Sequence, residues 1–75
     1  MYRLKQEWIE LFKELKNGTY EKYIGCSSFY ISGIVSGSKL CSETLAKALI
    51  SVKDDISFKD EQMPILLDKY FAKEK

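Results

Sequence analysis

The side chains that most often carry catalysis or bind metal ions are scarce in this 75-residue chain. It holds two cysteines, Cys26 and Cys41, and no histidine. One copy of the chain therefore cannot assemble the usual nitrogen and sulfur ligands of zinc, and it lacks the commonest general base. We expect reduced thiols, no metal site, no cofactor and no enzymatic activity, and we look for a binding function instead.

Acidic pairs offer a second kind of chemistry, a site for a divalent cation. The chain has two such pairs, Asp54-Asp55 and Asp60-Glu61. A calcium-binding loop needs a central glycine and a closing glutamate at a set spacing, and that pattern does not occur around these pairs. The pairs are more typical of solvated turns.

A third candidate is the stretch from Gly25 to Lys39, which is rich in serine and glycine and contains two aromatic residues. Gly25 is followed by Ile31 six positions later, by Ile34 three positions after that, and by Gly37 three further on. The first glycine suits a tight turn between two helices that cross steeply. The two isoleucines would anchor the second helix to the core, and the last glycine would end it.

This spacing, followed by Ser42-Glu43-Thr44-Leu45-Ala46-Lys47-Ala48-Leu49, resembles the Cro-like and lambda-repressor-like helix-turn-helix family of phage repressors. The similarity covers about residues 19–52. It implies that the helix at about 28–36 enters the major groove of double-stranded DNA. It also implies a transcriptional regulator, encoded by a phage or mobile element, that binds a near-palindromic operator as a homodimer.

The resemblance also assigns roles to individual residues. Bases would be read by side chains that face away from the anchoring isoleucines, and phosphates would be bound by the entry to the preceding helix and by the loop after Val35. The resulting DNA-binding set is Ser27, Ser28, Phe29, Ser32 and Gly33 on the helix, with Asn17, Thr19, Ser36, Ser38 and Lys39 on its flanks.

Two functions stay open for this surface. Glutamine, asparagine, arginine and lysine, which make bidentate base contacts, do not occur between Ser27 and Ser38. The serines would serve equally well as helix caps and solvated surface. An outward Phe29 would contact a thymine methyl group, a protein partner or a neighbouring subunit. The alternatives are a Cro-sized DNA-binding repressor and a helix-turn-helix fold used for protein binding, such as a phage-encoded inhibitor or antirepressor.

The hydrophobic spacing predicts the elements that position these residues. Leu4, Trp8, Leu11 and Leu15 predict a helix over 2–16 with Trp8 and Phe12 in the core. Further helices are predicted at 20–24, at about 28–36, from Ser42 with Leu45, Ala48, Leu49 and Val52 buried, and from 62–64 to about 72. The prediction is an all-α, compact five-helix domain over 1–75, with the helix-turn-helix at about 19–37.

Composition limits the remaining choices. The net charge of +1 is too small to argue for nucleic acid by itself. The longest apolar stretches, such as 63–67, are too short to cross a bilayer, and the first residues carry charges where a signal peptide needs an apolar core. We expect a cytoplasmic protein without a membrane role. The apolar residues of 56–75, namely Leu66, Leu67, Tyr70 and Phe71, predict a dimerisation segment.

Overall fold

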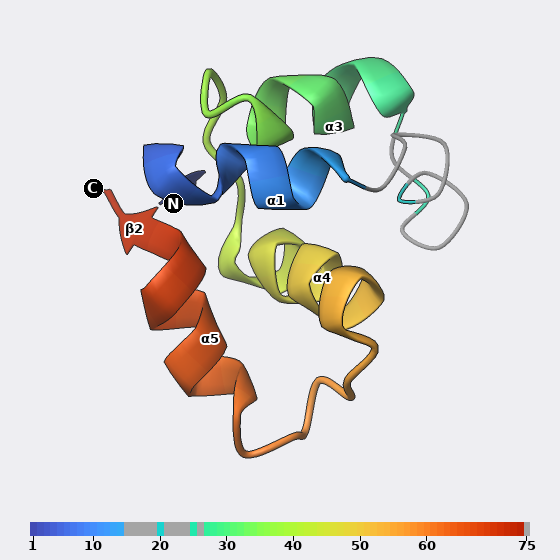
Figure 1. The fold of residues 1–75 in the computed structure, drawn as a ribbon, viewed down its shortest axis with the longest axis vertical. Helices are drawn as coiled ribbons and strands as arrows, with labels where there is room; N and C mark the ends of the chain where they lie inside the picture. The colour runs from blue at the N-terminus through green and yellow to red at the C-terminus, as the bar shows by residue number, and fades with distance from the viewer. Residues whose placement is uncertain (15–19, 21–24, 26, 75) are drawn as a thin grey trace.

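The structure, a computed structural model, describes residues 1–14, 20, 25 and 27–74. Along the chain it forms β1 (Tyr2–Leu4), a 3-10 turn η1 (Gln6–Trp8), α1 (Ile9–Lys13), α3 (Ser28–Val35), α4 (Glu43–Asp54), α5 (Met63–Tyr70) and β2 (Phe71–Lys73). Helix α1 lies between α3 and α4, and the two termini meet beside α1 (Figure 1). The domain is mostly helical. Its described residues form four α-helices and a two-stranded sheet, so the prediction of five helices and no strand is wrong.

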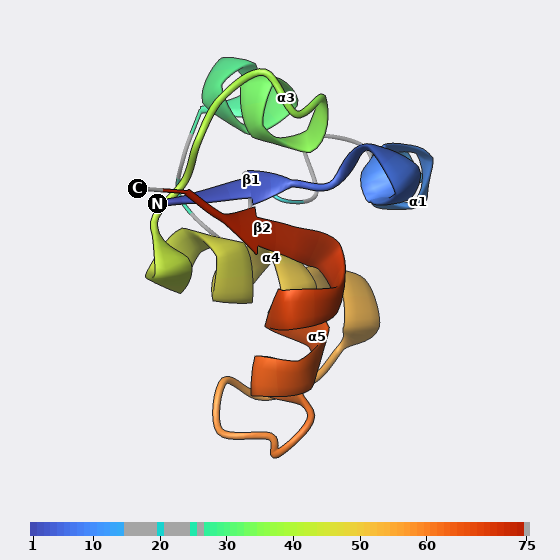
Figure 2. The same ribbon diagram turned by 90° about the vertical axis from the view of Figure 1, so that its left-hand side faces the viewer.

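The first correction concerns the predicted helix over 2–16. Its first three residues form β1 instead, which pairs antiparallel with β2 in the register Tyr2 with Lys73 and Leu4 with Phe71. Tyr2 and Leu4 are buried while Arg3 between them is partly exposed, which is the two-residue period of a strand. Figure 2 shows β1 and β2 running side by side between α3 and α4. The helical part begins only after the extended Lys5.

The second correction concerns the C-terminal helix, predicted to run to about Ala72. It ends at Tyr70, because Phe71 adopts an extended conformation with φ −121° and ψ 146° and begins β2. Pro64 lies in the first turn of α5, as the sequence predicts. Of the predicted helix at 20–24, the structure describes only Tyr20.

The predicted starts of α3 and α4 are confirmed. The Ser27 hydroxyl accepts a hydrogen bond from the Tyr30 amide, and the Ser42 hydroxyl accepts one from the Leu45 amide, so each serine caps its helix. The acidic pairs lie at helix ends. Asp55, with φ 54°, is the C-cap of α4. The Asp60 carboxylate accepts a hydrogen bond from the Gln62 amide just before α5.

A single core joins all these elements. Its buried members are Tyr2, Leu4, Phe12, Tyr20, Ile31, Ile34, Val35, Cys41, Ala46, Leu49, Ile50, Met63, Leu67, Tyr70 and Phe71. The placement of Phe12 in the core is confirmed, and Trp8 packs against it from the edge. The buried face of α4 differs from the predicted one. Leu49 is buried as predicted, together with Ala46 and Ile50. The other residues predicted to be buried, Leu45, Ala48 and Val52, are only partly buried.

Aromatic rings of η1 and α1 pack against those of α5 and β2. The ring centroids of Trp8 and Tyr70 lie 5.1 Å apart, those of Phe12 and Tyr70 5.2 Å, and those of Phe12 and Phe71 5.7 Å, all edge to face. The Tyr20 hydroxyl donates to the Phe12 carbonyl at 2.9 Å. Residues predicted to mediate dimerisation, Tyr70 and Phe71 among them, are therefore used within one chain. No described helix has the length and apolar character needed to cross a bilayer.

The turn before α3 yields a first prediction. Gly25 has φ +81°, a region that L side chains rarely adopt, while a Cβ there would meet open space. Gly25→Val should therefore lower the free energy of unfolding by more than about 1 kcal/mol through backbone strain alone. Gly25→Asn is the control and should cost less, because asparagine tolerates this region. Urea or thermal melts measure both, and an unchanged Gly25→Val variant would contradict a helix-turn-helix at this position.

Burial of Cys41 yields a second prediction. Burial raises the pKa of its thiol from 9.0 to about 11. The folded state therefore holds this proton more tightly than the unfolded state, so its contribution to stability is complete below pH 9 and is lost as the pH rises towards 11. From pH 9 to 11, the free energy of unfolding of the wild type should fall by roughly 2 kcal/mol more than that of Cys41→Ala. Unfolding curves measured at several pH values in this range test this. Parallel curves for the two proteins would contradict this.

Candidate nucleic-acid interface

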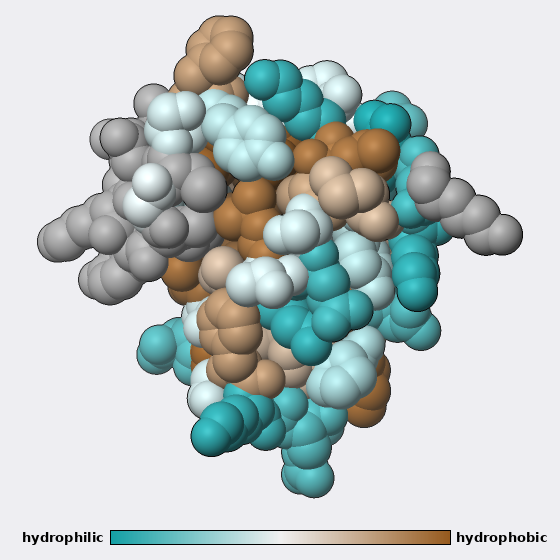
Figure 3. All heavy atoms as spheres, turned by 180° about the vertical axis from the view of Figure 1, so that it is seen from behind, coloured by the Kyte–Doolittle hydropathy of each residue, from teal (hydrophilic) through white to brown (hydrophobic). Residues whose placement is uncertain are grey.

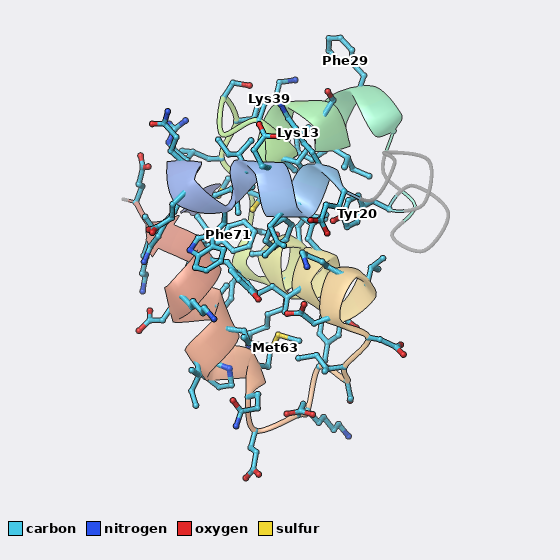
Figure 4. All side chains as sticks on the ribbon, viewed as in Figure 1. Lys13, Tyr20, Phe29, Lys39, Met63 and Phe71 are labelled. Carbon is cyan, nitrogen blue, oxygen red and sulfur yellow. The ribbon has the colours of Figure 1, made fainter. Side chains whose placement is uncertain are left out.

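Helix α3 lies on the surface with one face in the core and the other outward. Ile31, Ile34 and Val35 are buried, which confirms the predicted anchoring face. Phe29 and Ser32 are exposed on the opposite side, and the Phe29 side chain is 80% exposed. In Figure 4 its ring points away from the rest of the molecule at one end of the fold.

Two glycines bound this helix at the positions where the sequence predicts its preceding turn and its end, and both have positive φ. Gly25 precedes it with φ +81°, and Gly37 follows it with φ +80°. Gly37 is also closely packed, since a Cβ there would lie 3.2 Å from the Ile9 side chain. Its carbonyl accepts a hydrogen bond from Arg3 Nη1 at 2.6 Å, and Arg3 Nε donates to Glu74 at 2.7 Å. The loop after α3 is thus tied to both chain ends.

Within this loop, most donors are aimed at one carbonyl group. The Gly33 carbonyl accepts from the Ser38 and Lys39 amides at 3.0 and 3.1 Å. The Ser36 and Ser38 hydroxyls also each lie 3.0 Å from this oxygen and 3.0 Å from each other, so each hydroxyl proton is used either on this carbonyl or on the other serine. The Gly37 amide donates to the Ile34 carbonyl at 3.0 Å. These bonds satisfy carbonyl groups that a helix end leaves without partners.

This arrangement bears on the predicted phosphate contacts of Ser36 and Ser38. A hydroxyl has one proton, and a hydroxyl that donates to Gly33 offers only acceptor lone pairs to a ligand. A phosphate group needs donors. The amides of Gly37, Ser38 and Lys39 are likewise used inside the loop. The charged donor that the loop presents outward is the ammonium group of Lys39.

The Lys39 side chain is exposed but runs back across α3. Its side chain passes over Gly33, where an added Cβ would come within 2.6 Å of Lys39 Cδ and 2.9 Å of Cγ. Its Nζ lies 5.0 Å from the centroid of the Phe29 ring and 5.6 Å from that of Tyr30. These distances are within the range of cation–π attraction. We call Phe29, Tyr30, Gly33 and Lys39 the α3 cluster.

The charges around the α3 cluster favour an electron-rich partner. Between Gly25 and Ser42 the only charged residue of the sequence is Lys39. By contrast, carboxylates at 54, 55, 60 and 61 border the connection between α4 and α5. That connection lies at the far end of the fold from α3 in both ribbon views (Figures 1 and 2). In Figure 3 an apolar side chain projects at the α3 end with a hydrophilic one beside it, and hydrophilic side chains also gather at the opposite end.

The structure brings together part of the predicted DNA-binding set. Phe29, Ser32, Gly33, Ser36, Ser38 and Lys39 lie on α3 and its loop, and Ser27 caps the helix. Ser28 is the first residue of α3, and its side chain lies outside the described part, as do Asn17 and Thr19 entirely. Gly33 supports the Lys39 side chain and does not present a group of its own.

Sequence reasoning missed three contributions: the course of Lys39 over Gly33, the Tyr30 ring beside its ammonium group, and the tie from Arg3 to the loop. One signal was present. Glycine inside a helix costs about 0.5–1 kcal/mol relative to alanine, so a glycine in the middle of an otherwise regular helix indicates a close approach of another group. The sequence around Gly33 does not indicate which residue approaches it.

Comparison of the chain with protein-family models, with curated proteins and with solved structures finds no match. The resemblance to Cro-like proteins therefore remains a prediction that rests on residues 19–52.

Proposed function

We propose that this protein binds double-stranded DNA through the outward face of α3 and acts as a small transcriptional regulator. The observation that carries the proposal is the α3 cluster, an exposed aromatic ring and an ammonium group held together on a surface helix that has no carboxylate. Such a surface suits a ligand with both apolar and electronegative atoms on one edge.

The major groove of DNA offers both kinds of atom. It admits an α-helix, and its floor carries the methyl groups of thymine beside the acceptor atoms of guanine and adenine. The Phe29 ring matches the methyl groups, and the Lys39 ammonium matches the acceptors and the surrounding phosphates. Because the stretch 25–42 carries no acidic residue, α3 can approach the polyanion without placing a carboxylate of its own against it.

We propose that the protein binds as a homodimer, because one module with so few polar base contacts would have low affinity. Of the residues predicted to make the dimer contact, Leu67, Tyr70 and Phe71 are buried within the chain, so we propose that other residues of segment 56–75 make it. In segment 56–75 the exposed large apolar residues are Phe58 and Ile65, the latter 59% exposed. They replace the buried residues as the candidate contacts.

The exposure of Phe29 favours a second candidate function, protein binding. Aromatic anchors that fill a pocket on a partner contribute much of the energy of many protein interfaces. An inhibitor or antirepressor would use the Phe29 and Tyr30 rings in this way. In that case affinity for DNA would be feeble, and Phe29→Ala would abolish capture of the partner.

The DNA proposal predicts retention of DNA flanking the protein's own gene in a mobility-shift assay. Affinity should fall steeply between two salt concentrations, because phosphate neutralisation releases counterions. Phe29→Ala should weaken binding to the preferred fragment by about 1 kcal/mol or more and leave non-specific binding nearly unchanged. Lys59→Ala, at the far end of the fold, is the control and should bind as the wild type does. The proposal fails if the wild type retains no DNA at low salt, and specific capture of a host protein would then support the second function.

The dimer proposal predicts a two-chain species in sedimentation at tens of micromolar. Ile65→Glu should shift it to the monomer with little change in melting temperature, because the side chain is mostly exposed in one chain. Asp68→Asn, also exposed on α5, is the matched control. A wild type that stays monomeric both alone and on DNA would refute the dimer.

A further inference from the structure

The α3 cluster supports a specific account of which bases are read; this account rests on the proposed DNA-binding function. We propose that Lys39, held across Gly33, reads a guanine in the major groove, while Phe29 contacts the methyl group of a thymine in the neighbouring base pair. Gly33 acts as a positioning residue, because its missing side chain makes room for Lys39.

The position of Lys39 carries the first step. Its stem occupies the space that a side chain at position 33 would fill, since a Cβ there would lie 2.6, 2.9 and 3.0 Å from Lys39 Cδ, Cγ and Cε. Position 33 lies one helical turn after Phe29 on the outward face, where a residue of α3 would meet base edges. Lys39 thus supplies from the loop a side chain that α3 itself lacks there.

The chemistry of the ammonium group carries the second step. It has three donors and no acceptor, so it fits an edge that presents only acceptors. Guanine presents two acceptors, N7 and O6, side by side in the major groove, whereas adenine pairs N7 with a donor, cytosine presents a donor, and thymine presents a single acceptor, O4, beside its methyl group. A lysine directed at the bases therefore selects guanine.

The distance between the two groups carries the third step. Lys39 Nζ and the Phe29 ring centroid lie 5.0 Å apart. Neighbouring base pairs are separated by about 3.4 Å along the DNA axis, so two groups at this distance are close enough together to contact adjacent pairs. An apolar ring in the major groove is complementary to the thymine methyl group. The favoured site is therefore a G·C pair next to a T·A pair.

The probes for the test are duplexes selected by the wild type from a random double-stranded DNA pool. They should be enriched in thymine adjacent to guanine. Replacing that thymine by uracil removes only the methyl group, and replacing that guanine by 7-deazaguanine removes the N7 acceptor. Each change should weaken binding roughly tenfold. Inosine in place of the guanine lacks the 2-amino group but keeps the N7 and O6 acceptors of the major groove, so affinity should be unchanged.

Gly33→Ala separates the proposed contact from general charge attraction. Alanine favours a helix over glycine and must displace only the flexible Lys39 side chain, so the melting temperature should stay the same or rise. The variant should lose its sensitivity to 7-deazaguanine and keep its sensitivity to uracil. Lys39→Met should behave in the same way, and Lys59→Met is the matched control that should keep both sensitivities.

The outcomes distinguish this inference from the function on which it rests. If the wild type retains no double-stranded DNA at low salt, the proposed function fails, and this inference with it. If DNA is bound but uracil and 7-deazaguanine leave affinity unchanged, the inference is overturned while DNA binding stands. It is also overturned if Gly33→Ala reads guanine as the wild type does.

Discussion

The pairing of the two chain ends is the constraint on which the rest of the structure depends. β1 exchanges hydrogen bonds with β2 along one edge and, through Tyr2, with Cys41 on the other. It thereby joins the N-terminus, the C-terminus and the segment that leads into α4. Strands of three residues are too short to be stable alone. They persist because Tyr2, Leu4 and Phe71 are buried in the core that α1 and α5 complete.

The same pairing extends to the surface helix through Arg3. Its guanidinium group bridges Glu74, just beyond β2, and the Gly37 carbonyl in the loop after α3. That loop folds back on the Gly33 carbonyl and aims Lys39 along the helix. The direction of Lys39, whose ammonium group lies beside Phe29, therefore depends on a contact made at the chain termini. The loop that carries this outward-facing group is held by its own backbone hydrogen bonds and by the contact from β1 through Arg3.

The sequence predicted the elements whose signals are local. Helix α3, a serine cap at its start, its inward isoleucines and the two glycines that bound it all follow from short-range spacing, and each is present. The two strands did not follow, because the partner of each lies at the opposite end of the chain. For the same reason Tyr70 and Phe71 suggested an unpaired apolar surface. Their partners, the rings of Trp8 and Phe12, lie near the other end of the chain, and no periodicity near the C-terminus indicates them.

For the candidate site, the sequence predicted that α3 has an outward face and that Phe29 lies on it. The roles of the polar residues were not predictable from their types. Ser36 and Ser38 have the hydroxyls a phosphate would use, but the Gly33 carbonyl near the end of α3 also needs donors and lies 3.0 Å from both. Gly33 offers no side chain, yet its lack of one decides where Lys39 goes. A contact between these two residues, one on a helix and one on a loop, changes the surface that the helix presents. Inspection of α3 alone would find an uncharged helix with an outward aromatic ring, whereas the folded chain presents that ring with an ammonium group beside it.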